Sequence, residues 1–198
     1  MRGAGGEDTA EPHSRVECPM QIPNIETTRL HLRPIAPDDA PAIHAYMSDP
    51  IVTAFLPEGI FDEAAARNFA QKHSGEDATE VAVIEKASGQ LIGHMPFHLW
   101  FSPETYEIGW AFSRAAQGKG YATEAAGALM TYAFETLKAH RVIATCQPEN
   151  PASWRVAEKL GLRREAHFRS ALLQPSGEWW DEYLYAMLAE EYAGRALA

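Results

Sequence analysis

The stretch that decides the fold is Glu107–Ala126, which reads EIGWAFSRAAQGKGYATEAA. It joins a strand-like apolar run to a short loop with Gly118 and Gly120, and then to the start of a long helical pattern. The first N–H groups of a helix have no partner inside the helix, and the helix dipole favours negative charge there. Because the glycines let the backbone approach closely and Lys119 adds a positive charge, we expect this loop to bind a phosphate group.

Other interpretations of the same loop remain open from its residues alone. A P-loop requires lysine after its last glycine and directly before Ser or Thr, whereas Lys119 stands between two glycines. The dinucleotide-binding motif requires Gly or Ala at the position that Thr123 occupies. The spacing therefore disfavours both nucleotide motifs, but a plain tight turn before a helix remains compatible with the two glycines.

Outward from this loop, the chain alternates between strand and helix patterns. The order indicates an α/β or α+β domain rather than a barrel of repeated βα units. Residues 1–24 carry no period and are predicted to form a disordered tail, which leaves one domain over 25–195. Strands are predicted at 28–35, 79–85, 90–100, 105–112, 141–146, 164–173 and 178–187, and helices at 37–49, 63–73, 123–139 and 151–160.

The composition excludes several classes of protein. With only Cys18 and Cys146, the 198-residue chain is not a disulfide scaffold, and no apolar run is long enough for a membrane helix. The N-terminus lacks the apolar segment of a secretory signal, so a reducing cytoplasm is the expected compartment. The net charge of −10 argues against nucleic acid as a partner. Such a charge either steers cationic partners inward or only keeps the protein in solution.

Three segments resemble one known family. Residues 117–122 (QGKGYA) match the Q/R-x-x-G-x-G/A signature of the GNAT superfamily of acetyl-CoA-dependent N-acetyltransferases. Residues 25–50 and 147–169 resemble the opening strand and helix, and the later strand end, helix and strand, of its ribosomal-protein-alanine (Rim-type) branch. The resemblance implies a central mixed, mostly antiparallel sheet of about seven strands flanked by helices. It also implies that the fourth and fifth strands splay apart.

The resemblance further implies acetyl-CoA as cosubstrate, with no metal. Backbone groups of Trp110, Ala111 and Phe112 would pair with the pantetheine arm, and Asn150 and Ser153 would lie beside the arm and its sulfur. Asn150 before Pro151 also has the pattern of a plain helix cap, and both roles are compatible. The loop amides that would bind the pyrophosphate belong to Gln117, Gly118, Lys119, Gly120, Tyr121 and Ala122, with Tyr121 expected to pack against the cofactor.

The same resemblance assigns catalytic roles. Glu107 resembles the family's general base, acting on an ammonium group through a water, although an exposed strand glutamate would look the same. A backbone N–H near Phe112 is the expected donor to the oxyanion. Many relatives place an acidic tyrosine where this chain has Ala157, so Ser153 either protonates the thiolate or only anchors the thioester. Without that tyrosine, a CoA-binding sensor or scaffold without turnover remains the alternative.

Candidates for the acceptor pocket are Phe55, His94, His98, Trp100 and Phe101. His94 and His98 have the spacing of a helical metal pair, but their segment is a predicted strand, which places them roughly 13 Å apart. The pocket is expected to be shaped by residues 55–61 and the 163–187 hairpin, and to take an amine, either a protein N-terminus or a small molecule. Of Trp179 and Trp180, at most one faces the core, and the other is a candidate contact with an acceptor or with a second copy in a homodimer.

Overall fold

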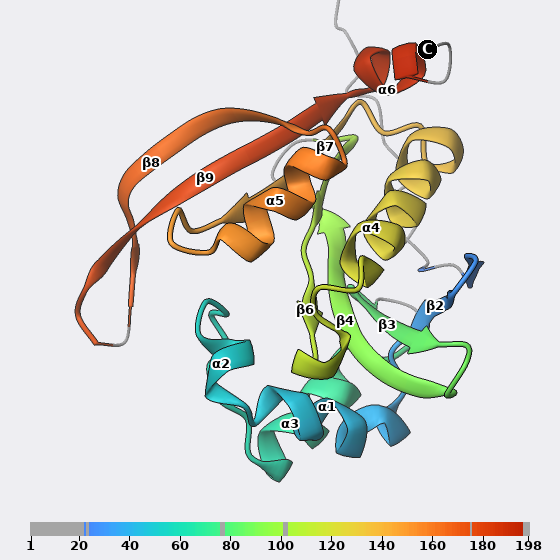
Figure 1. Ribbon diagram of the computed structural model, residues 1–198, viewed down its shortest axis with the longest axis vertical. Coiled ribbons are helices and arrows are strands. Elements are labelled where there is room, and N and C mark those ends of the chain that lie inside the picture. Colours follow the sequence, from blue (N-terminus) through green and yellow to red (C-terminus); the bar gives the residue numbers. More distant parts are fainter. Residues whose placement is uncertain (1–21, 23, 76–77, 101–102, 175, 196–198) are drawn as a thin grey trace, which may run out of the picture.

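The computed structural model describes residues 22, 24–75, 78–100, 103–174 and 176–195 (Figure 1). Most of the predicted tail, together with Phe101 and Pro175, therefore lies outside the described residues. Ile22, from the predicted tail, is described and is buried in the main hydrophobic core. No helix among the described residues is long and apolar enough to cross a membrane.

The described residues form one sheet of nine strands in the order β1-β2-β3-β4-β5-β7-β9-β8, with β6 paired to β4. All neighbouring pairs are antiparallel except β5 and β7, which confirms the predicted mixed, mostly antiparallel sheet. The strands are β1 (Ile25–Glu26), β2 (Leu30–Pro34), β3 (Glu80–Glu85), β4 (Gln90–Leu99), β5 (Thr105–Ile108), β6 (Ala111–Phe112), β7 (Arg141–Cys146), β8 (Arg163–Leu173) and β9 (Trp179–Leu188).

The seven predicted strands are all present, and two differences raise the number to nine. The short β1 was not predicted, and the predicted strand 105–112 is divided into β5 and β6. Both parts keep one register with β4, since Ile108 lies opposite Phe97 and Ala111 lies opposite His94. The division falls opposite Pro96, which has no N–H to continue the ladder.

The helices are α1 (Ala40–Met47), α2 (Pro50–Thr53), α3 (Glu63–Lys72), α4 (Tyr121–Thr131), α5 (Pro151–Lys159) and α6 (Ala189–Arg195). The predicted helix 37–49 is instead a 3-10 turn at Pro37–Asp39 followed by α1, and α2 was not predicted. The predicted helix 123–139 begins earlier, at Tyr121, and its end is a π-helical turn at Tyr132–Thr136. Asp62 caps α3 as predicted, because its side chain accepts from the N–H of Ala65 at 2.7 Å.

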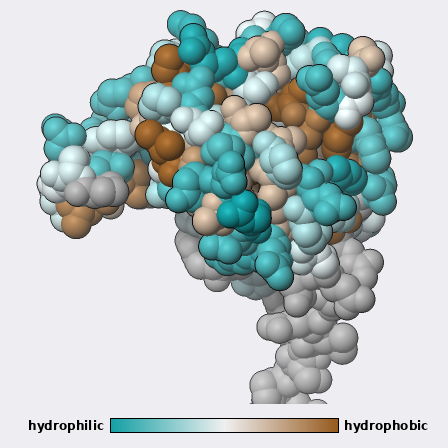
Figure 2. Space-filling model, turned by 90° about the horizontal axis from the view of Figure 1, so that it is seen from below, coloured by the Kyte–Doolittle hydropathy of each residue, from teal (hydrophilic) through white to brown (hydrophobic). Residues whose placement is uncertain are grey.

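The hydrophobic core lies on both faces of the sheet. Helices α4 and α5 pack against one face of the sheet, where the core includes Leu129 and Ala157. Helices α1 and α3 pack against the other face, where the core includes Ile43 and Phe69. The β8–β9 hairpin projects from this body as a curved arm (Figure 1). Seen from below, the arm stands clear of the body, and hydrophobic residues form separate patches on a largely hydrophilic surface (Figure 2).

The feature that positions the site is the gap between β5–β6 and β7. Strands β5 and β7 pair in parallel from Thr105 opposite Arg141 to Glu107 opposite Ile143, where the pairing ends. Beyond this point β7 continues to pair with β9, while β6 pairs with β4. The predicted splay between the fourth and fifth strands is therefore confirmed, and it leaves backbone groups of the 108–112 segment without a strand partner on that side.

Candidate active site

Two cavities meet at the splay. The first, of about 490 Å³, lies along residues 116–123 and the start of α5, and we call it the loop cavity. The second, of about 800 Å³, lies on the sheet face between residues 55–58 and the β8–β9 arm, and we call it the acidic cavity. Both cavities are lined by Phe55, Leu56, Trp110, Ala111, Asn150 and Ser153.

The loop preceding α4 has the geometry of an anion site. Gly118 and Gly120 have φ angles of +73° and +81°, in the left-handed region that favours glycine. A Cβ at residue 120 would meet only the Arg29 guanidinium at 3.5 Å, so the backbone conformation, not the space, requires glycine there. Gly120 precedes α4 with no side-chain cap, which leaves the first N–H groups of the helix to a ligand.

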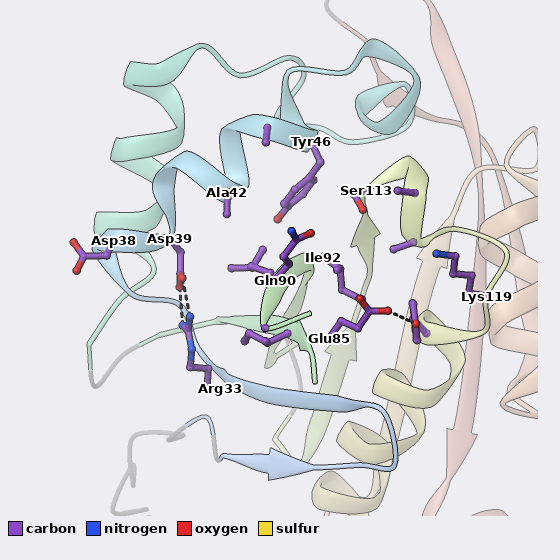
Figure 3. A pocket seen from close by; sticks show the side chains of 17 residues that line it. Arg33, Asp38, Asp39, Ala42, Tyr46, Glu85, Gln90, Ile92, Ser113 and Lys119 are labelled. Atoms are coloured by element: carbon purple, nitrogen blue, oxygen red, sulfur yellow. Dashed lines mark hydrogen bonds and ion pairs between the residues drawn. The ribbon is translucent and has the colours of Figure 1, made fainter. Parts of the chain in front are cut away.

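Three loop residues lie differently from the sequence prediction. The N–H of Gln117 donates to the carbonyls of Ser113 and Arg114 at 3.2 Å, and its side chain donates to the Phe112 carbonyl at 3.0 Å. Its amide is thus already used within the loop. The side chain of Lys119 points into a third cavity, of about 700 Å³, beside α1 and the β3–β4 hairpin (Figure 3).

Tyr121 also differs, because it is the first residue of α4 rather than a loop residue. Its hydroxyl donates to Glu85, which lines the third cavity (Figure 3). The Arg29 guanidinium lies 4.4 Å from the ring centroid of Tyr121. The hydroxyl is therefore held away from the loop cavity, and the backbone of Tyr121 is the part that lies at the helix start.

The backbone of the 109–113 segment alternates between β4 and the splay. Gly109 donates to the Pro96 carbonyl at 3.0 Å and Ser113 donates to the Ile92 carbonyl at 2.9 Å, so the odd-numbered residues face β4. Trp110 and Phe112 accordingly direct their N–H groups into the splay. Ala111, like Gly109 and Ser113, directs its backbone groups toward β4, so that of the three predicted backbone contacts only Trp110 and Phe112 remain available.

A hydrogen bond crosses the splay between the two cavities. The indole Nε1 of Trp110 donates to Ser153 Oγ at 3.0 Å, so this bond does not use the hydroxyl proton of Ser153, which can be donated to another acceptor. Asn150 caps α5 as its sequence predicts, since Oδ1 accepts from the Ser153 N–H at 3.2 Å and Pro151 follows. Burial raises the pKa of the nearby Cys146 thiol to about 11, although a hydrogen bond with Ser153 opposes the rise.

The charged residues divide the two cavities by sign. The charged side chains that line the loop cavity are Arg155 and Lys159 of α5. Those that line the acidic cavity are Glu58, Glu80, Glu107 and Glu182. The arrangement suits an anionic ligand on one side of the splay and a cationic ligand on the other.

Residues 29–163 match the family model of the acetyltransferase (GNAT) domain. The chain belongs to the GNAT family. It is 46% identical over 170 residues to an uncharacterized N-acetyltransferase of Bacillus subtilis (strain 168), YnaD, in an alignment that covers 85% of this chain and 99% of YnaD. The crystal structure of a GNAT-family acetyltransferase from Bacillus anthracis has a TM-score of 0.81 and 46% identity, and covers 85% of this chain and 99% of that one.

The predicted resemblance to the ribosomal-protein-alanine branch is also found, at lower identity. The [ribosomal protein uS5]-alanine N-acetyltransferase of Escherichia coli (strain K12) is 28% identical over 116 residues, which cover 59% of this chain and 56% of that protein. The relatives and the fold agree in assigning this chain to the GNAT family of N-acetyltransferases.

In this GNAT structure Glu107 lies at the last parallel pair before the splay and lines the acidic cavity. Its Oε1 accepts from Thr145 Oγ1 at 3.1 Å, and its Oε2 lies 3.6 Å from His98 Nε2. Glu182, on β9, lies near the Glu107 carboxylate. Burial and the negative charge of Glu107 raise the pKa of Glu182. Ala157, at the position of the family's tyrosine, is fully buried in the core.

The predicted acceptor residues separate into two groups. Phe55 and His98 line the acidic cavity, with the Phe55 ring centroid 5.7 Å from that of Trp180. His94 also lines it but is 4% exposed, and its Nδ1 lies 2.7 Å from the Tyr46 hydroxyl. Burial lowers the pKa of His94 to about 3, so it is a neutral imidazole.

Trp100, by contrast, packs against the small cluster of Ile143, Leu184 and Ala186, outside the residues that line either cavity. Of Trp179 and Trp180, it is Trp180 that lines the acidic cavity, while Trp179 is 58% exposed. Among the described residues, no three His, Cys, Asp or Glu side chains converge closely enough to hold a metal ion.

Sequence reasoning missed several residues of the site. Arg155 and Lys159 are four residues apart on α5, so the helical period could have revealed them as one cationic stripe beside Ser153. Glu58, Glu80, Glu182 and Thr145 come together only through the sheet and the arm. The sole local signal among them is Glu80, a carboxylate at the start of the apolar strand β3.

Proposed function

We propose that this chain transfers an acetyl group from acetyl-CoA to a primary amine, by direct attack of the amine within a ternary complex at the splay. The observation that carries the proposal is the meeting of two cavities of opposite charge at Trp110 and Ser153. CoA is strongly anionic, whereas an amine is a cation at neutral pH. Each cavity therefore suits one of the two substrates.

The residues present fit CoA. The N–H groups at the start of α4, together with Arg155 and Lys159, suit its phosphates, and the N–H group of Trp110 suits a carbonyl oxygen of the pantetheine arm. When bound, acetyl-CoA supplies the activated acetyl group as a thioester. The loop cavity holds the cofactor, and the acidic cavity receives the acceptor.

Glu107 is the residue that removes the proton from the acceptor ammonium, through an intervening water. Thr145 orients its carboxylate, and its place at the mouth of the splay brings it close to the point where the two cavities join. The N–H of Phe112 stabilises the negative charge that develops on the acetyl oxygen. The hydroxyl of Ser153, whose oxygen is held by Trp110, donates to the departing sulfur.

Calorimetric titration tests the cofactor, with acetyl-CoA as ligand and NAD and ATP as controls. Micromolar binding of acetyl-CoA alone supports the proposal, and the release of free CoA thiol in the presence of an amine panel then tests turnover. The panel contains peptides with free N-termini and small aliphatic amines, because the acceptor is either kind of amine.

The second candidate function is a CoA-binding sensor or scaffold without turnover, which the alanine at position 157 favours. Tight acetyl-CoA binding with no thiol release for any amine would support this candidate instead.

A further inference from the structure

The acidic cavity contains more carboxyl groups than one ammonium group requires. Its titratable lining residues are Glu58, Glu80, Glu107 and Glu182, with His94, His98 and Cys146, and its described lining includes no lysine or arginine. One carboxylate, Glu107, is enough to receive the reacting amine. The other glutamates need a separate explanation.

Glu80 is the member of this set that points to a ligand. It lines the cavity, is only 8% exposed, and its Oε2 atom is buried without a hydrogen-bond partner among the described residues. Burial, together with the charge of Glu58, raises the pKa of Glu80 to about 8, against the opposing positive charge of Lys72. A buried carboxyl oxygen without a partner is costly, and a cationic ligand would supply the missing donor.

The sheet register places Glu80 and Glu107 on one face. Glu80 lies opposite Pro96, whose carbonyl accepts from Gly109, and Glu107 is two residues before Gly109. Facing residues and residues two apart share a face of a sheet. With strands about 4.8 Å apart and a rise of about 3.3 Å per residue, the two Cα atoms lie roughly 12 Å apart.

We propose that the acceptor is an aliphatic diamine, with one amine at Glu107 for reaction and the second ammonium group bound by Glu80 and Glu58. This inference rests on the proposed function, since it names the acceptor class of the same site. The described glutamates do not converge as metal ligands, and their spread along the cavity matches two separate cations. The apolar spine of a diamine suits the apolar side chains that line the same cavity, among them Leu56, Pro57, Pro96, Leu172 and Trp180.

The test compares 1,5-diaminopentane with pentylamine, which has the same chain and lacks the second charge. Both are titrated calorimetrically into the whole protein, with and without saturating CoA, and both are then assayed as acceptors by thiol release. We expect the diamine to bind at least about tenfold more tightly, because a hydrogen bond to a charged group contributes that much. We expect the same preference in kcat/KM.

Glu80→Gln is the decisive variant, since it keeps the shape of the side chain and removes its ability to ionise against a bound ammonium group. It is expected to reduce the ratio of the two affinities to within about twofold, and Glu58→Gln, at the exposed rim, is expected to reduce it in part. Glu190→Gln, an exposed change of the same charge on α6, is the control and should leave the ratio unchanged.

Equal affinities in the wild-type protein, or an unchanged ratio in Glu80→Gln, would overturn the inference. Failure of acetyl-CoA to bind would instead overturn the proposed function. The two failures are distinguishable because the titration without CoA measures the diamine preference by itself.

Discussion

Replacement of Gly120 tests whether the loop before α4 holds the phosphates of CoA. We compare Gly120→Asp with Gly120→Asn, a pair that differs in charge and hardly in shape. Both variants place a side chain at a φ angle of +81°, and Asn and Asp tolerate this region better than other residues do. Any common loss therefore reports the backbone and the added volume, and the difference between them reports the charge.

The magnitude follows from the position of the introduced carboxylate. At about 5 Å from a phosphate and an effective dielectric constant of about 20, the repulsion costs roughly 3 kcal/mol, or about 100-fold in affinity. The Arg29 guanidinium lies 3.5 Å from the same Cβ position and would offset part of this repulsion. Arg29 is already bound to Glu124 Oε2 at 2.6 Å and to the Lys119 carbonyl at 2.9 Å, so we expect the offset to be small.

The assay is calorimetric titration of CoA, with thermal unfolding to verify that both variants remain folded. We expect Gly120→Asp to weaken binding at least about 30-fold more than Gly120→Asn does, a factor somewhat below the full charge repulsion. Equal weakening by the two variants would mean that no anion lies near residue 120. Unchanged affinity in both would remove the loop from the cofactor site altogether.

Three further predictions concern single side chains. Glu107→Gln is expected to lower kcat by about 100-fold or more and to leave the acetyl-CoA affinity within about twofold, and a full-rate variant would exclude Glu107 as the base. Ser153→Ala should lower kcat by less than Glu107→Gln does, and Trp110→Phe should lower kcat by about fivefold because the hydrogen bond to Ser153 is lost. The double variant should have the kcat of Ser153→Ala, since both changes remove the same interaction. If the two losses in kcat multiply instead, the two residues act independently. The pKa of Glu80 in the folded protein, about 8, lies above its value in the unfolded protein. Between about pH 4.5 and pH 8 the folded state therefore retains a proton that the unfolded state releases. The free energy of unfolding falls as the pH rises through this window. Glu80→Gln should therefore unfold at nearly the same temperature as wild type at about pH 5, and several degrees above wild type at about pH 8.5. The same difference in unfolding temperature at both pH values would refute the raised pKa of Glu80.

The parts of the site that the sequence predicts are those formed by neighbours along the chain. Gly118 and Gly120 before a helical pattern predict the anion site because the motif carries its own backbone geometry. Asn150 before Pro151 predicts the cap of α5 for the same reason, and the cap is present. Local sequence patterns thus predict the loop, the starts of these helices and most of the strands.

The parts that it misses depend on residues far apart in the chain. The bond between Trp110 and Ser153 joins residues 43 positions apart, and it gives Ser153 a defined orientation that no motif contains. The direction of Lys119 depends on the turn that two left-handed glycines impose, so a motif could name the residue but not the cavity that it faces. The burial of Glu80, at the start of β3, depends on the tertiary fold and not on its sequence neighbours.

The splay itself is fixed from the side of β4. A Cβ at Gly109 would lie 2.7 Å from Pro96 Cγ, and one at Gly93 would lie 2.5 Å from the Ala111 carbonyl oxygen. Glycine at both positions lets the 109–112 segment lie close against β4 at the level where it leaves β7. The close fit on one side holds the Trp110 and Phe112 N–H groups toward the gap on the other, so the proposed cofactor contacts depend on two glycines that do not line the loop cavity.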